Sequence, residues 1–276
     1  MTAQDSDAAA AAGGEPVVSV LLPLYNEERR LPRTYPQFLA FLDGFAPAGG
    51  AELVLADDCS ADGTWKLIEG LAREREDVVA VRVPVHGGKG AALRLAAARA
   101  RGRSLLAVDC DLSTDFSFYP PFAKLLQEHD IVIGSRRVAG ADVTKSQNLY
   151  KRCVGQIAQF LINRLNRWDY GDVNCGFKLY GPRTLGLFRH TVLDSVLMES
   201  EMLNFARLAG LRVKEEPVVW TNDEETRIGM RQYLHAMLEL CWMRLRFILG
   251  RYDVAAIKAA VADADADAPA AKTPEA

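Results

Sequence analysis

Apolar runs of strand length alternate with amphipathic helical segments along much of the chain. Five runs rich in β-branched residues and leucine predict buried strands, at residues 17–22, 52–56, 78–83, 104–108 and 130–134. Apolar residues at helical spacing between them predict helices at residues 31–42, 64–75 and 91–101. Strands that alternate with helices at intervals of roughly twenty to thirty residues indicate right-handed βαβ units. The pattern predicts an α/β fold with a mostly parallel sheet flanked by helices.

The second half of the chain is less regular. Residues 145–166 predict a long helix, the loop that starts at Asp172 enters a short strand, and Gly176 is expected to relieve the backbone there. A further helix is predicted to start at Met198, and a further strand at residues 212–220.

The segment at residues 230–251 predicts a C-terminal amphipathic helix. Its charged residues make it a poor membrane span. Its Trp, Tyr and Arg content fits a helix that lies in a membrane interface. A helix that packs on the rest of the protein is an equal alternative.

The two ends of the chain have a different composition. Residues 1–15 are mostly Ala, Asp, Gly and Ser, and they lack the features of a signal peptide. Residues 255–276 are largely repeated Ala, Asp and Pro. We therefore expect disordered tails at both ends, one folded domain at residues 16–228 and the amphipathic helix at residues 229–254.

Composition narrows the class of protein. A formal net charge of −3 gives no general electrostatic reason to expect a nucleic-acid partner. The five cysteines form no CxxC pair, which indicates reduced thiols of a cytosolic protein. The four histidines show no metal-ligand spacing, so a zinc site is not expected.

The fourth predicted strand ends in two carboxylates, Asp109 and Asp111. Acids at positions i and i+2 of an extended segment point the same way and repel each other unless a cation lies beside them. Mg²⁺ and Mn²⁺ take carboxylate oxygens and keep positions open for substrate phosphates. At the carboxyl edge of a parallel sheet, where open α/β folds bind substrates, the pair therefore predicts a metal site. Two helix-capping acids in a solvated loop are the alternative.

Other strand ends bring polar residues to the same edge. The first strand is followed by a loop that contains Tyr25, Asn26 and Glu27, which indicates a ligand-facing edge, and Asn26 could also cap a helix. The second strand ends in Asp57 and Asp58, which suit hydrogen bonds to the ribose or base of a nucleotide.

A basic residue follows two further strands. Lys89 stands in a glycine-rich stretch at a predicted helix N-terminus, which indicates an anion site. A P-loop is excluded, because it would need Gly at Val83 and Ser or Thr at Gly90. Arg136 follows the fifth strand and brings a cation to the edge that carries the acids.

In this order, the motifs resemble glycosyltransferase family 2. The resemblance covers residues 17–252 and is carried by Pro23-Leu24-Tyr25-Asn26-Glu27-Glu28, Asp57-Asp58-Cys59-Ser60, Gly88-Lys89-Gly90, Asp109-Cys110-Asp111 and Gly134-Ser135-Arg136. Later motifs resemble the polyprenyl-phosphate branch, and within it the dolichyl-phosphate β-glucosyltransferases: Asn174-Cys175-Gly176-Phe177-Lys178-Leu179, Pro217-Val218-Val219-Trp220 and Met243-Arg244-Leu245-Arg246-Phe247. The resemblance implies a Rossmann-like, nucleotide-sugar-binding domain of GT-A type at residues 16–228. His86 departs from the family, in which Asn is common at this position.

The same resemblance implies roles for individual residues. The donor is expected to be bound by Pro23, Tyr25, Asn26, Glu27, Asp58, Lys89 and Asp109. Asp109 and Asp111 would hold Mg²⁺ or Mn²⁺, and the acceptor phosphate would be bound by Arg136, Arg152, Thr226 and Arg227. Glu201 would orient the sugar or the acceptor and completes the expected catalytic set of Asp109, Asp111, Arg136 and Glu201. Arg152 and Arg227 could instead be surface charges, and Glu201 a helix N-terminal acid.

The implied reaction is an inverting transfer of a hexose, with glucose foremost, from a UDP-sugar to a polyprenyl phosphate such as dolichyl or undecaprenyl phosphate. An acceptor phosphate is already anionic near pH 7, so no general base is required. The expected partners are a nucleotide sugar, the lipid and a membrane surface, with the protein peripheral on the cytoplasmic face.

Three alternatives remain open. The donor could be another nucleotide sugar such as GDP-mannose. The acceptor could be a sugar hydroxyl, which would need a carboxylate base, with Glu199 and Glu201 as candidates. The chain could also be a binding module for nucleotide sugars without activity, although the intact acid pair argues against it.

Overall fold

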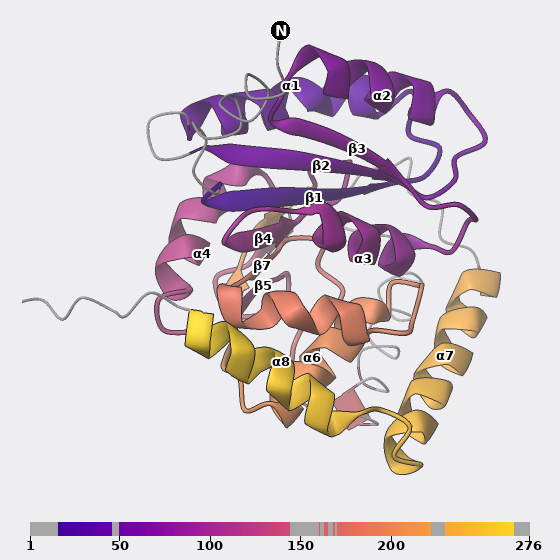
Figure 1. Ribbon diagram of the computed structural model, residues 1–276, viewed down its shortest axis with the longest axis vertical. Helices are drawn as coiled ribbons and strands as arrows, with labels where there is room; N and C mark the ends of the chain where they lie inside the picture. The colour runs from indigo at the N-terminus through magenta and orange to yellow at the C-terminus, as the bar shows by residue number, and fades with distance from the viewer. Residues whose placement is uncertain are drawn as a thin grey trace, which may run out of the picture.

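The computed structural model describes residues 16–45, 50–143, 160, 163–164, 168, 170–221 and 230–267. Its centre is a seven-stranded sheet with the strand order β3-β2-β1-β4-β7-β5-β8 (Figure 1). These strands are β1 (Val18–Leu24), β2 (Ala51–Asp57), β3 (Val78–Arg82), β4 (Ser104–Ala107), β5 (Ile131–Ser135), β7 (Lys178–Tyr180) and β8 (Val213–Pro217). A separate two-stranded sheet pairs β6 (Asp142–Val143) with β9 (Val219–Trp220). The α/β fold with a mostly parallel sheet is confirmed.

Helices cover both faces of the main sheet. They are α1 (Leu31–Gly44), α2 (Thr64–Glu74), α3 (Lys89–Arg99), α4 (Tyr119–Leu125), α6 (Met198–Leu208), α7 (Met230–Ile248), α8 (Val254–Asp267) and the 3₁₀ segments η3 (Phe116–Phe118) and η4 (Pro182–His190). The alternating side chains of the strands fill two cores. One core contains buried residues of α1, α2 and α4, and the other contains buried residues of α3, η4, α6, α7 and α8.

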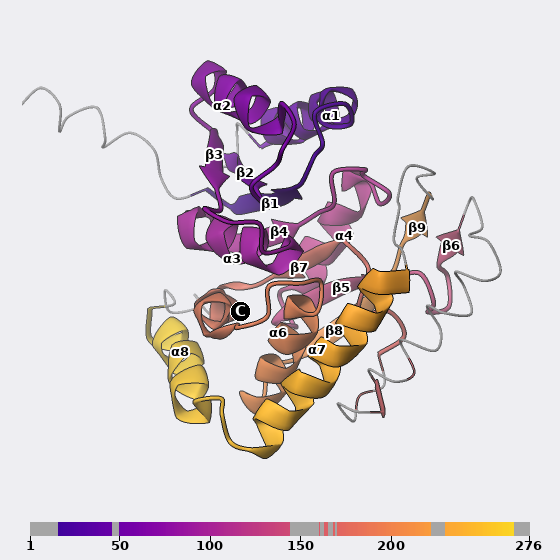
Figure 2. The ribbon, with the colours of Figure 1, turned by 90° about the vertical axis from the view of Figure 1, so that its right-hand side faces the viewer.

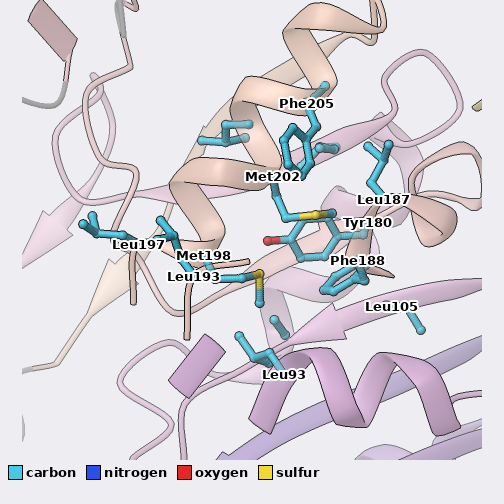
Figure 3. Packing of buried hydrophobic residues seen from close by; sticks show 14 of the residues in the cluster. Leu93, Leu105, Tyr180, Leu187, Phe188, Leu193, Leu197, Met198, Met202 and Phe205 are labelled. Carbon is cyan, nitrogen blue, oxygen red and sulfur yellow. The ribbon is translucent and has the colours of Figure 1, made fainter. Parts of the chain in front are cut away.

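The second core is centred on Tyr180 of β7. Figure 3 shows Met202 and Phe205 of α6 beside the ring of Tyr180, and Met198 of the same helix directed toward Leu93 of α3. Tyr180 and Phe188 meet edge to face, with 5.1 Å between ring centroids. This packing fixes α6 against the sheet and thereby places the acids of its first turn next to the ends of the strands.

Strand β7 is antiparallel to both of its neighbours, β4 and β5, whereas the other pairs in the main sheet are parallel. Its first residue, Lys178, therefore pairs with Ala107 at the end of β4 and with Ile133 in β5. The loop that leads into β7 consequently lies at the edge where the parallel strands end.

The end of the chain differs from the predicted disordered tail. The tail that was expected from residue 255 is wrong as far as Asp267, because this stretch belongs to helix α8. Ile257, Ala260 and Val261 recur at helical spacing and are buried, and α8 contacts η4. The Ala- and Asp-rich composition concealed this short apolar stripe. Residues 1–15 and 268–276 lie outside the described part, as does the helix expected at 145–166, apart from helical residues 160, 163 and 164.

The described side chains of α7 that pack on the domain lie on one face of the helix. Leu240 and Met243 are buried in the second core, which confirms the packed alternative for this helix. The described helices include none with both the length and the apolar character needed to cross a membrane.

Candidate active site

The carboxyl ends of β1, β2 and β4 meet at one edge of the sheet, which faces the viewer in Figure 2. Asp109 and Asp111 follow β4 at this edge and line a cleft together with Thr114, Gly176 and Trp220. The N–H of Leu112, which has a φ of +46°, donates to the carbonyl oxygen of Asp109 over 3.1 Å. The acids therefore flank a tight turn rather than an extended segment. The helix cap of η3 is Asp115, so capping does not account for the pair.

One oxygen of each acid is bonded within the protein. Asp109 Oδ1 lies 2.8 Å from Lys89 Nζ, and Asp111 Oδ1 accepts from the N–H of Ser113 over 3.0 Å. Oδ2 of each acid is thus the oxygen that a cation in the cleft would take. The Thr114 hydroxyl oxygen is buried and, within the described residues, has no hydrogen-bond partner, which leaves it for a ligand or water.

The two acids have opposite pKa shifts. Desolvation by the surrounding protein raises the pKa of Asp109, but the cations Lys89, Lys178 and Arg136 together lower it by more, so the net pKa is below the usual value. Burial and the negative charge of Asp109 raise the pKa of Asp111. The described part of the chain holds no cluster of three or more metal-ligating side chains. Two carboxylates therefore fit a hard cation that takes its other ligands from a bound diphosphate.

Gly176 lies against Asp109. A Cβ atom at Gly176 would lie 1.9 Å from Asp109 Oδ2 and 2.4 Å from Asp109 Cγ, closer than any van der Waals contact. The expectation that glycine relieves the backbone here is therefore incomplete. The position needs glycine because the backbone of the loop before β7 passes directly beside the carboxylate.

Lys89 connects Asp109 to helix α6. Its ammonium group lies 2.8 Å from Asp109 Oδ1 and 3.2 Å from Glu199 Oε2. Burial lowers the pKa of Lys89, but the Asp109 and Glu199 carboxylates raise it by more, so the pKa lies above the usual value and the group stays charged.

The predicted nucleotide-binding residue Asp58 is buried beneath the loop before α3. Its carboxylate accepts from the N–H groups of Gly87 and Gly88 over 2.9 and 2.7 Å, and it lies 2.8 Å from His86 Nδ1. Tyr25 stacks on His86 with 4.1 Å between ring centroids and is 44% exposed. The exposed aromatic surface at this end of the site thus comes from Tyr25 and His86. Asp58 fixes the imidazole of His86 and the loop that follows it.

The other residues expected at the donor site support the loop that follows β1. Pro23 is half-buried within β1. The side-chain oxygen of Asn26 accepts from the N–H of Ala61 over 2.9 Å, so Asn26 joins two loops and does not cap α1. Glu27 forms an ion pair with Arg30 at 2.7 Å.

Arg136 lies at the end of β5, and its guanidinium group is anchored. It donates through Nε and Nη2 to Asp172, at 2.5 and 2.8 Å, and it lies 5.2 Å from the ring centroid of Trp220, which lines the cleft. Burial lowers the pKa of Arg136, but Asp172, with smaller contributions from Cys175 and Asp109, raises it by more, so the net pKa is above the usual value. The three other expected acceptor residues, Arg152, Thr226 and Arg227, lie outside the described residues.

Glu201 lies away from the cleft. Its side chain is fully buried, Oε2 accepts from the N–H groups of Val192 and Leu193 over 2.8 and 3.1 Å, and Oε1 accepts from the Tyr252 hydroxyl. These contacts give Glu201 a structural role, and its expected role in orienting the sugar or the acceptor stays a prediction. The alternative of a helix N-terminal acid is confirmed, because Glu201 lies in the first turn of α6, where it also binds a neighbouring loop.

The sequence reasoning assigned no role to three residues of the site: Lys178, Asp172 and Trp220. Each stands within or beside a motif of the resemblance, but the pairing partners lie tens of residues away. The position of β7 between β4 and β5 brings Lys178 and the loop with Asp172 to the site, and Trp220 reaches it from β9, which pairs with β6.

Three comparisons place this geometry among known proteins. The family model described as "Glycosyl transferase family 2" matches residues 19–184. "Glycosyltransferase AglD" of Haloferax volcanii is 32% identical over 228 residues, which is 81% of this chain and 36% of AglD, so the chain spans about a third of that relative's length. "Dolichyl-phosphate beta-glucosyltransferase" of Drosophila melanogaster is 28% identical over 255 residues, covering 87% of this chain and 78% of the relative. The human protein of the same name is 26% identical over 249 residues, covering 85% and 77%.

Solved structures show the same fold. The glucosyl-3-phosphoglycerate synthase of Mycobacterium tuberculosis superposes with a TM-score of 0.59 at 20% identity, covering 88% of this chain and 85% of that one. A complex of that enzyme with Mn²⁺, UDP-glucose and phosphoglyceric acid gives a TM-score of 0.59 at 17% identity, with coverages of 88% and 84%. The predicted GT-A type fold is confirmed. Because the family model runs from β1 into η4 and covers more than half of the chain, this protein belongs to glycosyltransferase family 2.

Proposed function

We propose that this chain transfers a hexose, with glucose foremost, from a UDP-sugar to a polyprenyl phosphate and inverts the anomeric centre. The observation that carries the proposal is the pair Asp109 and Asp111 in a cleft beside the ends of β1 and β2. The acceptor class is supported by the relatives named dolichyl-phosphate beta-glucosyltransferase, which match most of this chain.

Asp109 and Asp111 are the residues that would hold Mg²⁺ or Mn²⁺. When bound, the ion would neutralise the charge that builds up on the departing nucleoside diphosphate. Tyr25 offers an exposed ring for stacking against the nucleobase, next to the loop residues Pro23, Asn26 and Glu27 and to buried Asp58. Lys89 keeps Asp109 charged and in place.

The acceptor side is formed by Arg136, and we propose Arg152, Thr226 and Arg227 as its further contacts. A guanidinium group matches the geometry of phosphate oxygens, and Asp172 fixes the orientation of Arg136. A hydroxyl acceptor would need a carboxylate base, but both oxygens of Glu199 and of Glu201 are engaged. This favours a phosphate acceptor, which needs no base.

The proposed function is tested by transfer of radiolabelled glucose from UDP-glucose to a short polyprenyl phosphate, with Mg²⁺, Mn²⁺ or EDTA. We expect a glycolipid that forms only with metal, resists alkali and is cleaved by mild acid. GDP-mannose and free sugar acceptors serve as comparison reactions. Donor binding without lipid product, across several nucleotide sugars and polyprenyl phosphates, would contradict the proposal.

We also propose that α7 lies on an anionic membrane surface, with the chain peripheral on its cytoplasmic face. The face of α7 opposite Leu240 and Met243 is apolar and exposed. Its members are Leu238, Trp242, Leu245 and Ile248, and the exposed Leu249 follows directly after the helix. Figures 1 and 2 show α7 on the side where the parallel strands end, so a lipid phosphate would enter the site from this surface.

The charges around this apolar face favour anionic lipid as its occupant. Arg244, Arg246 and Arg251 lie on or next to the last turns of α7, and Arg246 lies 4.6 Å from the ring centroid of Trp242. An aromatic ring with adjacent guanidinium groups suits the level of lipid headgroups.

Leu245→Glu is expected to weaken binding to vesicles of phosphatidylcholine and phosphatidylserine about tenfold, because it places a charge where a leucine would be buried. Co-sedimentation with the vesicles measures this binding. Gln127→Glu is the control, since it makes the same charge change at an exposed site after α4 and is expected to bind like the wild type. Equal binding of both variants would rule out α7 as the contact, and a dimer that Leu245→Glu dissociates would identify a second copy as its occupant.

A further inference from the structure

Four charged side chains form a continuous chain that ends at the cleft. Lys178 Nζ lies 2.7 Å from Glu199 Oε1, Glu199 Oε2 lies 3.2 Å from Lys89 Nζ, and Lys89 Nζ lies 2.8 Å from Asp109 Oδ1. Positive and negative groups alternate, so each inner member has an opposite charge on both sides.

The chain joins four separate segments of the fold. Lys178 begins β7, Glu199 lies in the first turn of α6, Lys89 begins α3 and Asp109 follows β4. Lys178 is fully buried and also donates to the carbonyl oxygen of Cys175 over 2.5 Å, and Glu199 is 2% exposed. Asp109 is the most exposed member, with 43% of its side chain accessible. The charges thus run from the protein interior to the carboxylate that lines the cleft.

Stability alone is a poor explanation for such a chain. Buried ion pairs lose much solvation energy, and apolar residues of similar size often stabilise a protein equally well or better. What distinguishes this series of four charged side chains is that it ends at the cleft. Its last contact fixes Asp109 Oδ1, while Asp109 Oδ2 remains on the side of Gly176 and the cleft.

We propose that Lys178 and Glu199 are positioning residues for the metal-binding carboxylate. They hold the ammonium group of Lys89, and Lys89 holds Asp109 in the orientation that directs Oδ2 toward a cation on the donor diphosphate. The inference rests on the proposed function, since it assumes that Asp109 binds metal. It excludes Glu199 as a general base, because each of its oxygens is bound to a lysine.

The test is the affinity for Mn²⁺ in the presence of UDP, measured by the loss of the free Mn²⁺ electron paramagnetic resonance signal. Glu199→Gln and Lys178→Met are each expected to raise the dissociation constant of Mn²⁺ about tenfold, which is the usual scale for residues that orient a metal ligand. The apparent kcat is expected to fall while the KM for the lipid stays unchanged. Glu199→Gln keeps the size of the side chain, so it decides the question if Lys178→Met does not fold.

Glu52→Gln is the matched control. Glu52 is also fully buried and bound to a basic residue, Arg101, at 2.9 Å, but it lies at the start of β2, away from the cleft. The Glu52→Gln variant is expected to have a lower melting temperature than the wild type and the same affinity for Mn²⁺. If Glu199→Gln behaves in the same way, the residue is merely structural and the inference is overturned.

The wild-type protein separates this inference from the proposed function. Mn²⁺ binding with UDP in the absence of any glycolipid product would contradict the proposed acceptor and leave the positioning inference standing. If the wild-type protein bound UDP but did not bind Mn²⁺ in its presence, both the positioning inference and the metal site would be overturned.

Discussion

Asp111→Ala is expected to lower the rate of sugar transfer about a thousandfold, because it removes one of the two carboxylates available to the metal. Asp111 is held in a tight turn next to Asp109, where the like charge raises its pKa in addition to the effect of burial. A cation between the two acids would relieve this repulsion. The measurement is the initial rate of glycolipid formation at saturating Mn²⁺.

Asp115→Ala serves as the control for Asp111→Ala. Asp115 lies four residues later and caps η3 by accepting from the N–H of Ser117 over 2.8 Å. Its loss removes a helix cap and is expected to leave the transfer rate within about twofold of the wild type. If Asp111→Ala retained a tenth or more of the wild-type rate, a metal site at this pair would be excluded.

Gly176→Ala is expected to lower the transfer rate about a hundredfold and to weaken the binding of Mn²⁺ with UDP. The added methyl group would lie 1.9 Å from Asp109 Oδ2, so either the carboxylate or the loop before β7 must move. A misplaced catalytic group commonly costs about two orders of magnitude in rate. Transfer assays and Mn²⁺ titrations on the same protein sample measure both effects.

Gly70→Ala is the control for Gly176→Ala. Gly70 lies within α2, and a Cβ atom there would have nothing within 4 Å. The change is expected to stabilise the protein by roughly 0.5–1 kcal/mol, because alanine favours a helix over glycine. Wild-type activity in Gly176→Ala would show that Asp109 tolerates displacement and would contradict its role as a metal ligand.

The regular part of the fold could be predicted because local pattern and tertiary environment agree there. The strands β1, β2, β4 and β5 are largely apolar and buried, β3 is half-buried at the edge of the sheet, and all five predicted positions match within two residues at each end. The acid pair was equally visible, since two carboxylates one residue apart at the end of an apolar run repel each other unless they share a cation.

The unpredicted features depend on contacts between distant segments. Nothing local in Lys178 to Tyr180 indicates that β7 runs against its neighbours, and this orientation brings Lys178 to Glu199 and Gly176 to Asp109. The family resemblance assigned Glu201 to the site, yet its partners are a loop and Tyr252, which lies 51 residues away. Sequence order alone does not show that Glu199 contacts the lysines at the cleft while Glu201, two residues later, binds a loop and Tyr252.

The antiparallel strand β7 also has a consequence for how this enzyme family diversifies. It separates the sheet into a part with β1, β2, β3 and β4, which carries the proposed donor and metal residues, and a part with β5 and β8, which carries Arg136. Within the described sheet, β7 is the strand that joins the two parts by backbone hydrogen bonds, through its pairs with β4 and β5. Substitutions in β5 or β8 can therefore accumulate without changing the strand pairing of β1 to β4, whereas β7, which pairs with β4 and carries Lys178, is constrained by both parts.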